Sequence, residues 1–157
     1  MFKNTKQIVN LLKKKKITLS VAESCTGGML AQEITSISGS SRVFKFGVIT
    51  YSNNAKIKYL KVPSKIIKRY GAVSEECCYS MLKNLSKISK TNINIVTTGI
   101  AGPTGGSKLK PIGLVYIGVK IKKKIMLRKY RFKNKGRTNI QKATVRKILD
   151  LVLKLIK

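Results

Sequence analysis

The stretch ITLSVAESCTGG, residues 17–28, joins a run of apolar and β-branched residues to a pair of glycines. The first half, ITLSVA (17–22), predicts a buried strand, because a short run of this kind bounded by turn residues is typical of one. Gly27 and Gly28 predict a tight turn, and a helix is expected from there to about Ile37. A buried strand that turns through glycines into a helix is an element of an α/β fold.

The rest of the chain continues this alternation of helices and strands. Helices are expected at roughly 4–15 and 53–60, after Pro63, after Ser74 as an N-cap, and from Thr138, which has capping-box spacing to Gln141. Strands are expected at 43–52, 92–99, 112–121 and 124–132, the last two as a hairpin. This order predicts the α/β class: a single three-layer α/β/α domain, residues 1–157, with a mixed, mostly parallel sheet of about five or six strands.

The absence of histidine excludes several kinds of active site. Without it, one chain cannot build a Ser-His-Asp or Cys-His site, and histidine-ligated metals are not expected. Acids are almost as scarce, since the chain has five Asp and Glu residues in total. The sequence therefore predicts no metal and no cofactor, and an enzyme built on it would carry protons on Lys, Tyr or one isolated Glu.

The formal charge of +29 allows two interpretations. It arises from 34 Lys and Arg against 5 Asp and Glu, and the excess is mostly Lys spread along the chain. A strongly basic chain can bind nucleic acid, but arginine is the residue favoured for clamping phosphates and reading bases. Because Ile and Asn are abundant as well, we favour a diffuse, solvated surface over a nucleic-acid partner.

The same composition bears on location. No apolar run has the length of a membrane span, and the first residues lack the apolar core of a secretory signal, so no membrane partner is expected. Cys25, Cys77 and Cys78 form an odd set without a C-x-x-C motif, which is a poor basis for a disulfide framework. A reducing, cytoplasmic location is therefore predicted.

Glycine-rich loops follow two of the expected strands. SCTGG (24–28) follows the first, and TGIAGPTGG (98–106) follows the strand at 92–99. Open α/β sheets bind ligands beyond the carboxyl ends of their strands, where glycine lets backbone N–H groups approach an anion. The loops indicate an anion pocket, although neither P-loop nor dinucleotide-binding spacing fits; two tight turns without a ligand are the structural alternative.

Six motifs in one order resemble a known family. AESCTGG (22–28), SGSSRVF (38–44), YSNNAK (51–56), YGAVSEE (70–76), TGIAGPTGG (98–106) and KPIGLVYIG (110–118) are similar to the CinA carboxy-terminal family, also known as competence/damage-inducible protein A. The resemblance implies an α/β/α domain with nicotinamide-nucleotide amidase activity, which converts nicotinamide mononucleotide to nicotinate mononucleotide and ammonia in NAD salvage. A homo-oligomer is expected. Relatives often carry two arginines four residues apart; here Arg137 matches the first, while Gln141 occupies the second position.

The resemblance also implies roles for particular residues. Ser24 would be the nucleophile, with Tyr51 and Lys56 as the pair that handles its proton. Lys56 would need a depressed pKa, because roughly one lysine in 2,500 is neutral at pH 7. Backbone N–H groups near Thr26–Gly28 would stabilise the oxyanion. Together with the two loops, the motifs predict these substrate-binding residues: Glu23, Thr26, Gly27, Gly28, Arg42, Gly102, Gly105, Gly106, Lys110 and Arg137.

Each role has an alternative that the sequence leaves open. Ser24 fits an N-cap, Cys25 a small buried side chain, Tyr51 core packing and Lys56 a solvated surface residue. Glu23 fits either the support of the serine or Lys56, or the capping of backbone donors. At the level of the whole chain, the alternatives to an amidase are a basic nucleic-acid-binding protein and a relative that binds nucleotide without turnover.

Overall fold

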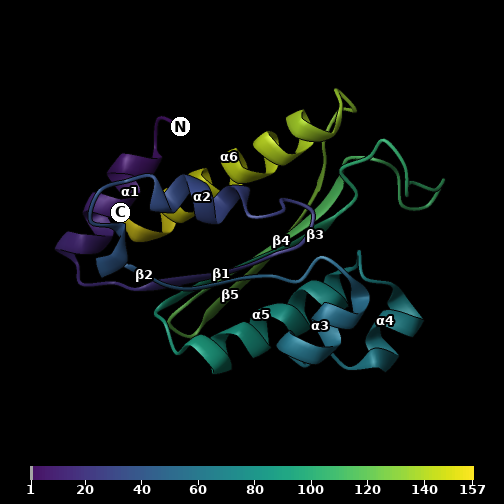
Figure 1. Ribbon diagram of the computed structural model, residues 1–157, viewed down its shortest axis with the longest axis horizontal. Helices are drawn as coiled ribbons and strands as arrows, with labels where there is room; N and C mark the ends of the chain where they lie inside the picture. Colours follow the sequence, from purple (N-terminus) through teal and green to yellow (C-terminus); the bar gives the residue numbers. More distant parts are fainter. Residues whose placement is uncertain (1) are drawn as a thin grey trace.

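A computed structural model describes residues 2–157 and shows one five-stranded sheet in the order β2-β1-β3-β4-β5 (Figure 1). Its strands are β1 (Leu19–Glu23), β2 (Phe44–Ile49), β3 (Ile93–Gly99), β4 (Leu114–Ile121) and β5 (Lys124–Arg131). β1 pairs in parallel with β2 and β3, whereas β4 is antiparallel to both β3 and β5. Four strands therefore share one direction, and the predicted mixed, mostly parallel sheet is confirmed.

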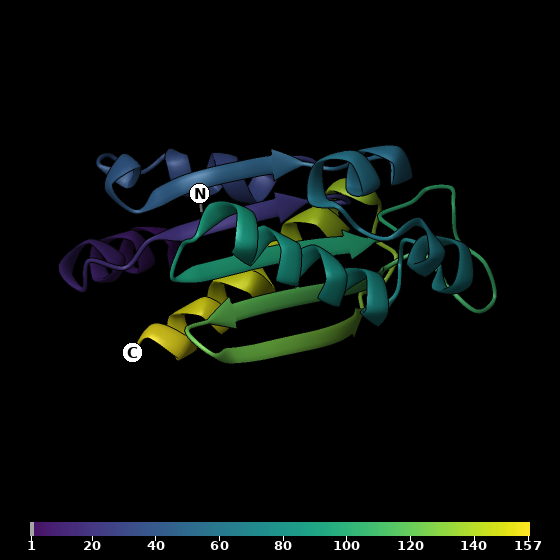
Figure 2. The same cartoon turned by 90° about the horizontal axis from the view of Figure 1, so that it is seen from below.

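Helices cover both faces of this sheet, which gives the expected three layers (Figures 1 and 2). One layer holds α1 (Thr5–Lys14), α2 (Met29–Thr35) and α6 (Arg137–Ile156). The other holds α3 (Asn53–Leu60), α4 (Ser64–Tyr70) and α5 (Glu75–Ser89), and a 3₁₀ turn, η1 (Ser40–Arg42), precedes β2. Among residues 2–157, no helix combines the length and apolarity needed to cross a bilayer.

The central strand explains why residues 17–22 are apolar without alternation. All five residues of β1 are buried, because a helical layer lies on each side of it. Leu19 and Val21 face the core under α1, α2 and α6, whereas Ala22 faces the core under α5. A strand covered on both faces has no solvent side on which polar residues would alternate with apolar ones.

Two of the expected boundaries change. The strand predicted at 43–52 ends at Ile49, because the buried Thr50 directs its carbonyl away from the sheet to the Lys56 Nζ. The capping box at Thr138 is wrong: α6 begins at Arg137 after Gly136, whose φ is 90°, and the Gln141 side chain bonds elsewhere. The Ser74 cap is confirmed, since its hydroxyl accepts the N–H of Cys77 at 3.1 Å.

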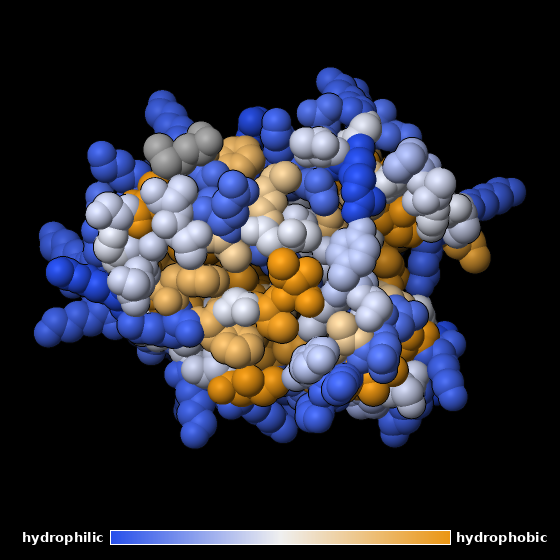
Figure 3. Space-filling model, viewed as in Figure 1, coloured by the Kyte–Doolittle hydropathy of each residue, from blue (hydrophilic) through white to orange (hydrophobic). Residues whose placement is uncertain are grey.

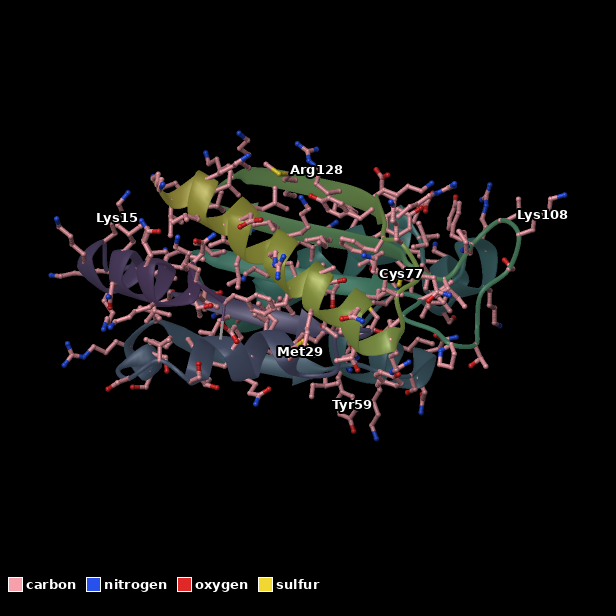
Figure 4. The ribbon with its side chains drawn as sticks, turned by 90° about the horizontal axis from the view of Figure 1, so that it is seen from above. Lys15, Met29, Tyr59, Cys77, Lys108 and Arg128 are labelled. Atoms are coloured by element: carbon pink, nitrogen blue, oxygen red, sulfur yellow. The ribbon has the colours of Figure 1, made fainter. Side chains whose placement is uncertain are left out.

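The lysines are spread over the surface as well as over the sequence. Figure 3 shows hydrophilic side chains projecting along most of the outline of the face it displays, with hydrophobic side chains gathered toward the centre. Lys108, in the loop between β3 and β4, and Arg128, in β5, point away from the molecule at well-separated places (Figure 4). These placements agree with lysines and arginines that are spread along the chain.

Some of these lysines occupy backbone positions that favour glycine. Lys61 and Lys90 follow α3 and α5 with φ of 53° and 51°, in the left-handed region where a Cβ is strained. We expect Lys90→Gly to raise the free energy of unfolding by about 0.5–1 kcal/mol, measured by urea denaturation. Lys87→Gly, in the last turn of α5, is the matched control and should lower it by about 1 kcal/mol; stabilisation by both substitutions would contradict the explanation.

Candidate active site

Ser24 lies where β1 leaves the sheet. β1 pairs with β3 as far as Ala22 opposite Val96, and with β2 as far as Glu23 opposite Ile49. Ser24 is the first residue beyond both ladders, and residues 25–28 then turn into α2. The carboxyl ends of three parallel strands meet at this edge, which is where α/β sheets place their ligand sites.

Lys56 reaches Ser24 from the neighbouring strand connection. Ser52 caps α3 by accepting the N–H of Ala55, and the following turn directs Lys56 inward, where it is only 1 % exposed. Its Nζ lies 2.9 Å from the Ser24 Oγ. The fold thus brings Lys56 and Ser24 into contact at one edge of the sheet, and a solvated role for Lys56 is excluded.

The surroundings of the Lys56 amine favour its neutral form. Burial lowers the pKa of Lys56 from 10.5, with the Cys77 and Cys25 thiols acting in the opposite direction. The Nζ also lies 2.7 Å from the Thr50 carbonyl oxygen and 3.4 Å from that of Tyr51. A neutral amine has two hydrogens and one lone pair, so two carbonyls can take the hydrogens and leave the lone pair for the Ser24 hydroxyl.

Glu23 caps α2 and is not directed at a substrate. Its two carboxylate oxygens accept the N–H groups of Gly28 (3.1 Å), Leu30 (3.1 Å) and Ala31 (2.8 Å). The helix N-terminus is therefore occupied by an anion of the protein itself, a favourable partner for its positive end. These contacts favour the capping alternative for Glu23 over a direct contact with a substrate.

The capping also narrows the choice of oxyanion donors. The Gly28 N–H belongs to Glu23, and the Gly27 N–H donates to the Ser24 carbonyl at 3.1 Å. Among residues 2–157, no protein oxygen accepts the N–H groups of Cys25 and Thr26, and the Cys25 N–H interacts with the thiol of the same residue. Of the donors predicted near Thr26–Gly28, those of Gly27 and Gly28 are engaged within the protein, whereas that of Thr26 remains a candidate and is joined by Cys25.

A threonine of β3 bonds to the loop that carries Ser24. The Thr97 Oγ1 accepts the Ser24 N–H at 3.3 Å and lies 3.0 Å from the Thr26 Oγ1. Both threonines are buried, and the Thr26 hydroxyl, expected to contact a substrate, has the Thr97 hydroxyl as a protein partner. The sequence offered no signal for Thr97, because a β-branched residue in a strand needs no functional explanation.

A pocket of about 280 Å³ opens beside Ser24. Its wall comes from Ser24 and Cys25, from Tyr51, from residues 99–102, 104 and 105 of the second glycine-rich loop, and from Arg137. Gly102 and Gly105 line it as predicted. Gly106 does not: it packs behind the loop, where an added Cβ would lie 2.8 Å from the Ile112 Cγ1.

The first turn of α6 closes one side of this pocket. The Arg137 guanidinium donates to the Gly102 carbonyl at 2.8 Å and to the Tyr51 hydroxyl, above whose ring it lies. One turn further on, the Gln141 Nε2 donates to the Cys25 carbonyl at 2.9 Å. The Tyr51 side chain is 56 % exposed and held at the rim, so core packing is excluded. The hydrogen bond from Lys56 to Tyr51 goes to the Tyr51 backbone carbonyl and not to its hydroxyl.

Two predicted cations lie away from the pocket. Arg42 belongs to η1, before β2, and so lies at the opposite end of the sheet from Ser24. The Lys110 ammonium donates to the Tyr70 carbonyl at the end of α4. Both were predicted to bind substrate from their places in the sequence motifs, but the fold brings neither of them to this pocket. Arg137 is the one cationic side chain in the wall that the structure describes.

The cysteines are poor candidates for the nucleophile. Burial raises the pKa of the Cys25 thiol to about 12, although the Thr97 hydroxyl and Lys56 act against it. Burial also raises the pKa values of Cys77 and Cys78. The thiolate is the reactive form of cysteine, and a raised pKa makes it scarce at neutral pH. Cys25 is therefore best described as a small buried side chain that lines the pocket beside Ser24.

This fold and site define a class of α/β/α proteins. In this class, a serine at the carboxyl-terminal edge of the sheet contacts a buried lysine amine, and the site contains no histidine. The chain belongs to the CinA family, because the model of the CinA C-terminal domain matches residues 2–156. The family predicted from the motifs is confirmed.

Individual relatives agree with this assignment. A CinA-like protein of Dictyoglomus turgidum is 45% identical over 145 residues, covering 92% of this chain and 35% of that protein. A CinA-like protein of Kosmotoga olearia is 48% identical over 122 residues, covering 78% and 30%. The chain thus spans about a third of the length of these curated relatives. The crystal structure of the competence/damage inducible protein CihA from Agrobacterium tumefaciens superposes with a TM-score of 0.93 at 34% identity, covering 100% of this chain and 98% of that one.

Proposed function

We propose that this chain is an amidohydrolase that deamidates nicotinamide mononucleotide to nicotinate mononucleotide and ammonia, with Ser24 as nucleophile and Lys56 as its base. The observation that carries the proposal is the 2.9 Å contact between the Ser24 Oγ and a fully buried Lys56 amine. A surface lysine would be protonated and could not accept a proton, whereas burial gives this one access to the neutral form.

In the first half of the reaction, the Lys56 amine takes the proton of the Ser24 hydroxyl as the Oγ attacks the carboxamide carbon. The oxygen of that carboxamide gains negative charge, which the N–H groups of Cys25 and Thr26 would stabilise. Lys56 then returns the proton to the nitrogen of the carboxamide, the C–N bond breaks, and ammonia leaves. The pyridine carbonyl remains as an ester on Ser24.

In the second half, water replaces ammonia. Lys56 takes a proton from the water, whose oxygen attacks the ester carbon, and gives that proton to the departing Ser24 Oγ. The products are the carboxylate and the free enzyme, so no oxidant, metal or cofactor is consumed. One base serves both halves, in agreement with the single buried amine beside Ser24.

Arg137 supports a phosphorylated substrate. Its guanidinium has five N–H donors, and two of its nitrogens already donate to Gly102 and Tyr51. These contacts hold the group rigidly at the rim and leave donors for a phosphate. The glycines of the same loop, Gly102 and Gly105, let the backbone approach that phosphate closely.

The test is ammonia release by the purified protein from nicotinamide mononucleotide, with nicotinamide riboside and free nicotinamide as controls. We expect turnover of the mononucleotide and a large loss with the two compounds that lack phosphate. Absence of ammonia from all three would overturn the proposed function, and equal rates on the riboside and mononucleotide would overturn the phosphate site.

The charge of +29 keeps nucleic-acid binding as a second candidate. A dedicated nucleic-acid protein should bind tightly at physiological salt, and its affinity should fall steeply as salt rises. Because the excess charge is mostly Lys spread along the chain, we expect only weak, non-specific binding, measurable by a salt titration with single- and double-stranded DNA and RNA.

The neighbouring thiol gives a separate prediction. Because the pKa of Cys25 is raised to about 12, Cys25→Ser should keep amidase activity within roughly tenfold of the unmodified protein. The measurement is ammonia release at neutral pH, together with insensitivity to a thiol-alkylating reagent. An inactive Cys25→Ser variant alongside an active Ser24→Ala variant would make the protein a thiol enzyme.

A further inference from the structure

Thr97 is the point at which the Ser24 loop is attached to β3 after regular pairing has ended. The β1–β3 ladder stops at Ala22 opposite Val96, one residue before Thr97. Beyond it, the Thr97 Oγ1 accepts the N–H of Ser24 at 3.3 Å and lies 3.0 Å from the Thr26 Oγ1. One side chain thus continues the attachment that the backbone of β3 no longer provides.

These two contacts lie on either side of Cys25. They fix the residue before it and the residue after it, and so fix the peptide units of Cys25 and Thr26, whose N–H groups donate to no protein oxygen among residues 2–157. The other supports of the loop act elsewhere: Glu23 holds Gly28, and Gln141 holds the Cys25 carbonyl. On the β3 side, the support that the structure describes is the Thr97 hydroxyl.

We infer that Thr97 is a positioning residue that holds the Ser24 hydroxyl and the two adjacent N–H groups in register with Lys56. The inference rests on the proposed function, since it concerns the same serine. Thr97 is fully buried and does not line the pocket, so it acts through the loop and not by touching a substrate. Its contribution should therefore appear in the reaction of the bound substrate.

Thr98 provides a matched control on the same strand. It is also a buried threonine, 1 % exposed, with one hydroxyl bond, but that bond goes to the Ala72 carbonyl at 2.7 Å on the other side of the sheet. Valine has nearly the shape of threonine and lacks the hydroxyl. Thr97→Val and Thr98→Val therefore remove equivalent groups, and only the first removes contacts to the Ser24 loop.

The experiment compares both valine variants and Thr97→Ser with the unmodified protein, using the full chain. Ammonia release from nicotinamide mononucleotide gives kcat and KM, and mass spectrometry follows the rate at which a fluorophosphonate probe labels Ser24. We expect Thr97→Val to lower kcat and the labelling rate by roughly 10- to 100-fold, since small misplacements of reacting groups cost about that much, with KM within about twofold. Thr97→Ser should restore most of the loss, and Thr98→Val should stay near the unmodified protein.

The two readouts separate this inference from the proposed function. Labelling of Ser24 without hydrolysis of the mononucleotide would refute the substrate and still test Thr97 through the labelling rates. Equal losses in Thr97→Val and Thr98→Val, a loss confined to KM, or an unlabelled Ser24 in the unmodified protein would each overturn the role of Thr97. If Thr97→Val does not accumulate as folded protein, Thr97→Ala takes its place, judged against the same serine variant.

Discussion

Ser24→Ala and Lys56→Gln should each lower the kcat of amide hydrolysis by roughly 10² or more, and the double mutant should be little worse than either single one. General acid–base help alone is worth about 10²–10⁴, and a nucleophile and its base lose their effect together. The structural basis is that one 2.9 Å contact joins the two groups. Binding of the mononucleotide should largely persist in all three variants, because neither residue belongs to the proposed phosphate site.

Lys58→Gln is the matched control for the lysine. It removes the same group from the same helix, but Lys58 is exposed and lies near the Tyr59 ring, outside the pocket. Its activity should equal that of the unmodified protein, as measured by ammonia release and, for binding, by the shift in melting temperature with the mononucleotide. Additive losses in the double mutant would contradict a shared proton transfer, and full activity in Lys56→Gln would move the base to another group.

The sequence predicted the elements of the fold better than their ends. Hydrophobic runs and glycines placed all five strands, because those signals reflect burial on two faces and turns that only glycine forms easily. Ends depend on single side-chain contacts that composition does not reveal. Thr138 has the spacing of a helix cap, yet Gln141, its expected partner, bonds to Cys25 on another element, and the helix begins one residue earlier.

In the candidate site, too, some residues could be predicted from the sequence and others depend on the fold. Ser24 stands out after a buried strand, but Lys56 is one of many lysines, and residue patterns alone do not single it out; the family motif did so. Arg42 and Glu23 were assigned to a substrate from their places in motifs, whereas topology puts Arg42 at the far end of the sheet and Glu23 under α2. Thr97 escaped notice because its role depends on which strands lie side by side.

Lys56 should also give the protein a distinctive dependence on pH. Burial lowers its pKa in the folded state below 10.5, whereas the unfolded chain keeps an ordinary lysine. Between the folded pKa and the unfolded value, the unfolded state binds more protons, so the free energy of unfolding rises as pH rises through that interval. Below the folded pKa both states are protonated, and the cost of burying the ammonium is fully present.

Lys56→Met isolates this effect, because the replacement has similar length and no charge. The other lysines titrate in both proteins, so the difference between the two free energies of unfolding reports Lys56 alone. We expect the stability of the methionine variant relative to the unmodified protein to be greatest at the lowest pH of the range, where Lys56 is most protonated. That advantage should shrink with rising pH by at most about 1.4 kcal/mol per pH unit, which urea unfolding from pH 7 to about 10 would measure.

The enzymatic activity should depend on the same titration of Lys56, because the reaction requires the neutral form of its amine. The neutral amine is the base, so kcat/KM should rise with pH, level off above the folded pKa of Lys56, and reach half its limit below pH 10.5. The pH at which activity is half-maximal and the pH at which the stability difference begins to shrink should coincide, since one proton governs both. A stability difference that is constant over the whole range would mean that Lys56 keeps an ordinary pKa. The Ser24 hydroxyl would then face an ammonium at neutral pH, and the proposed base would have to be another group.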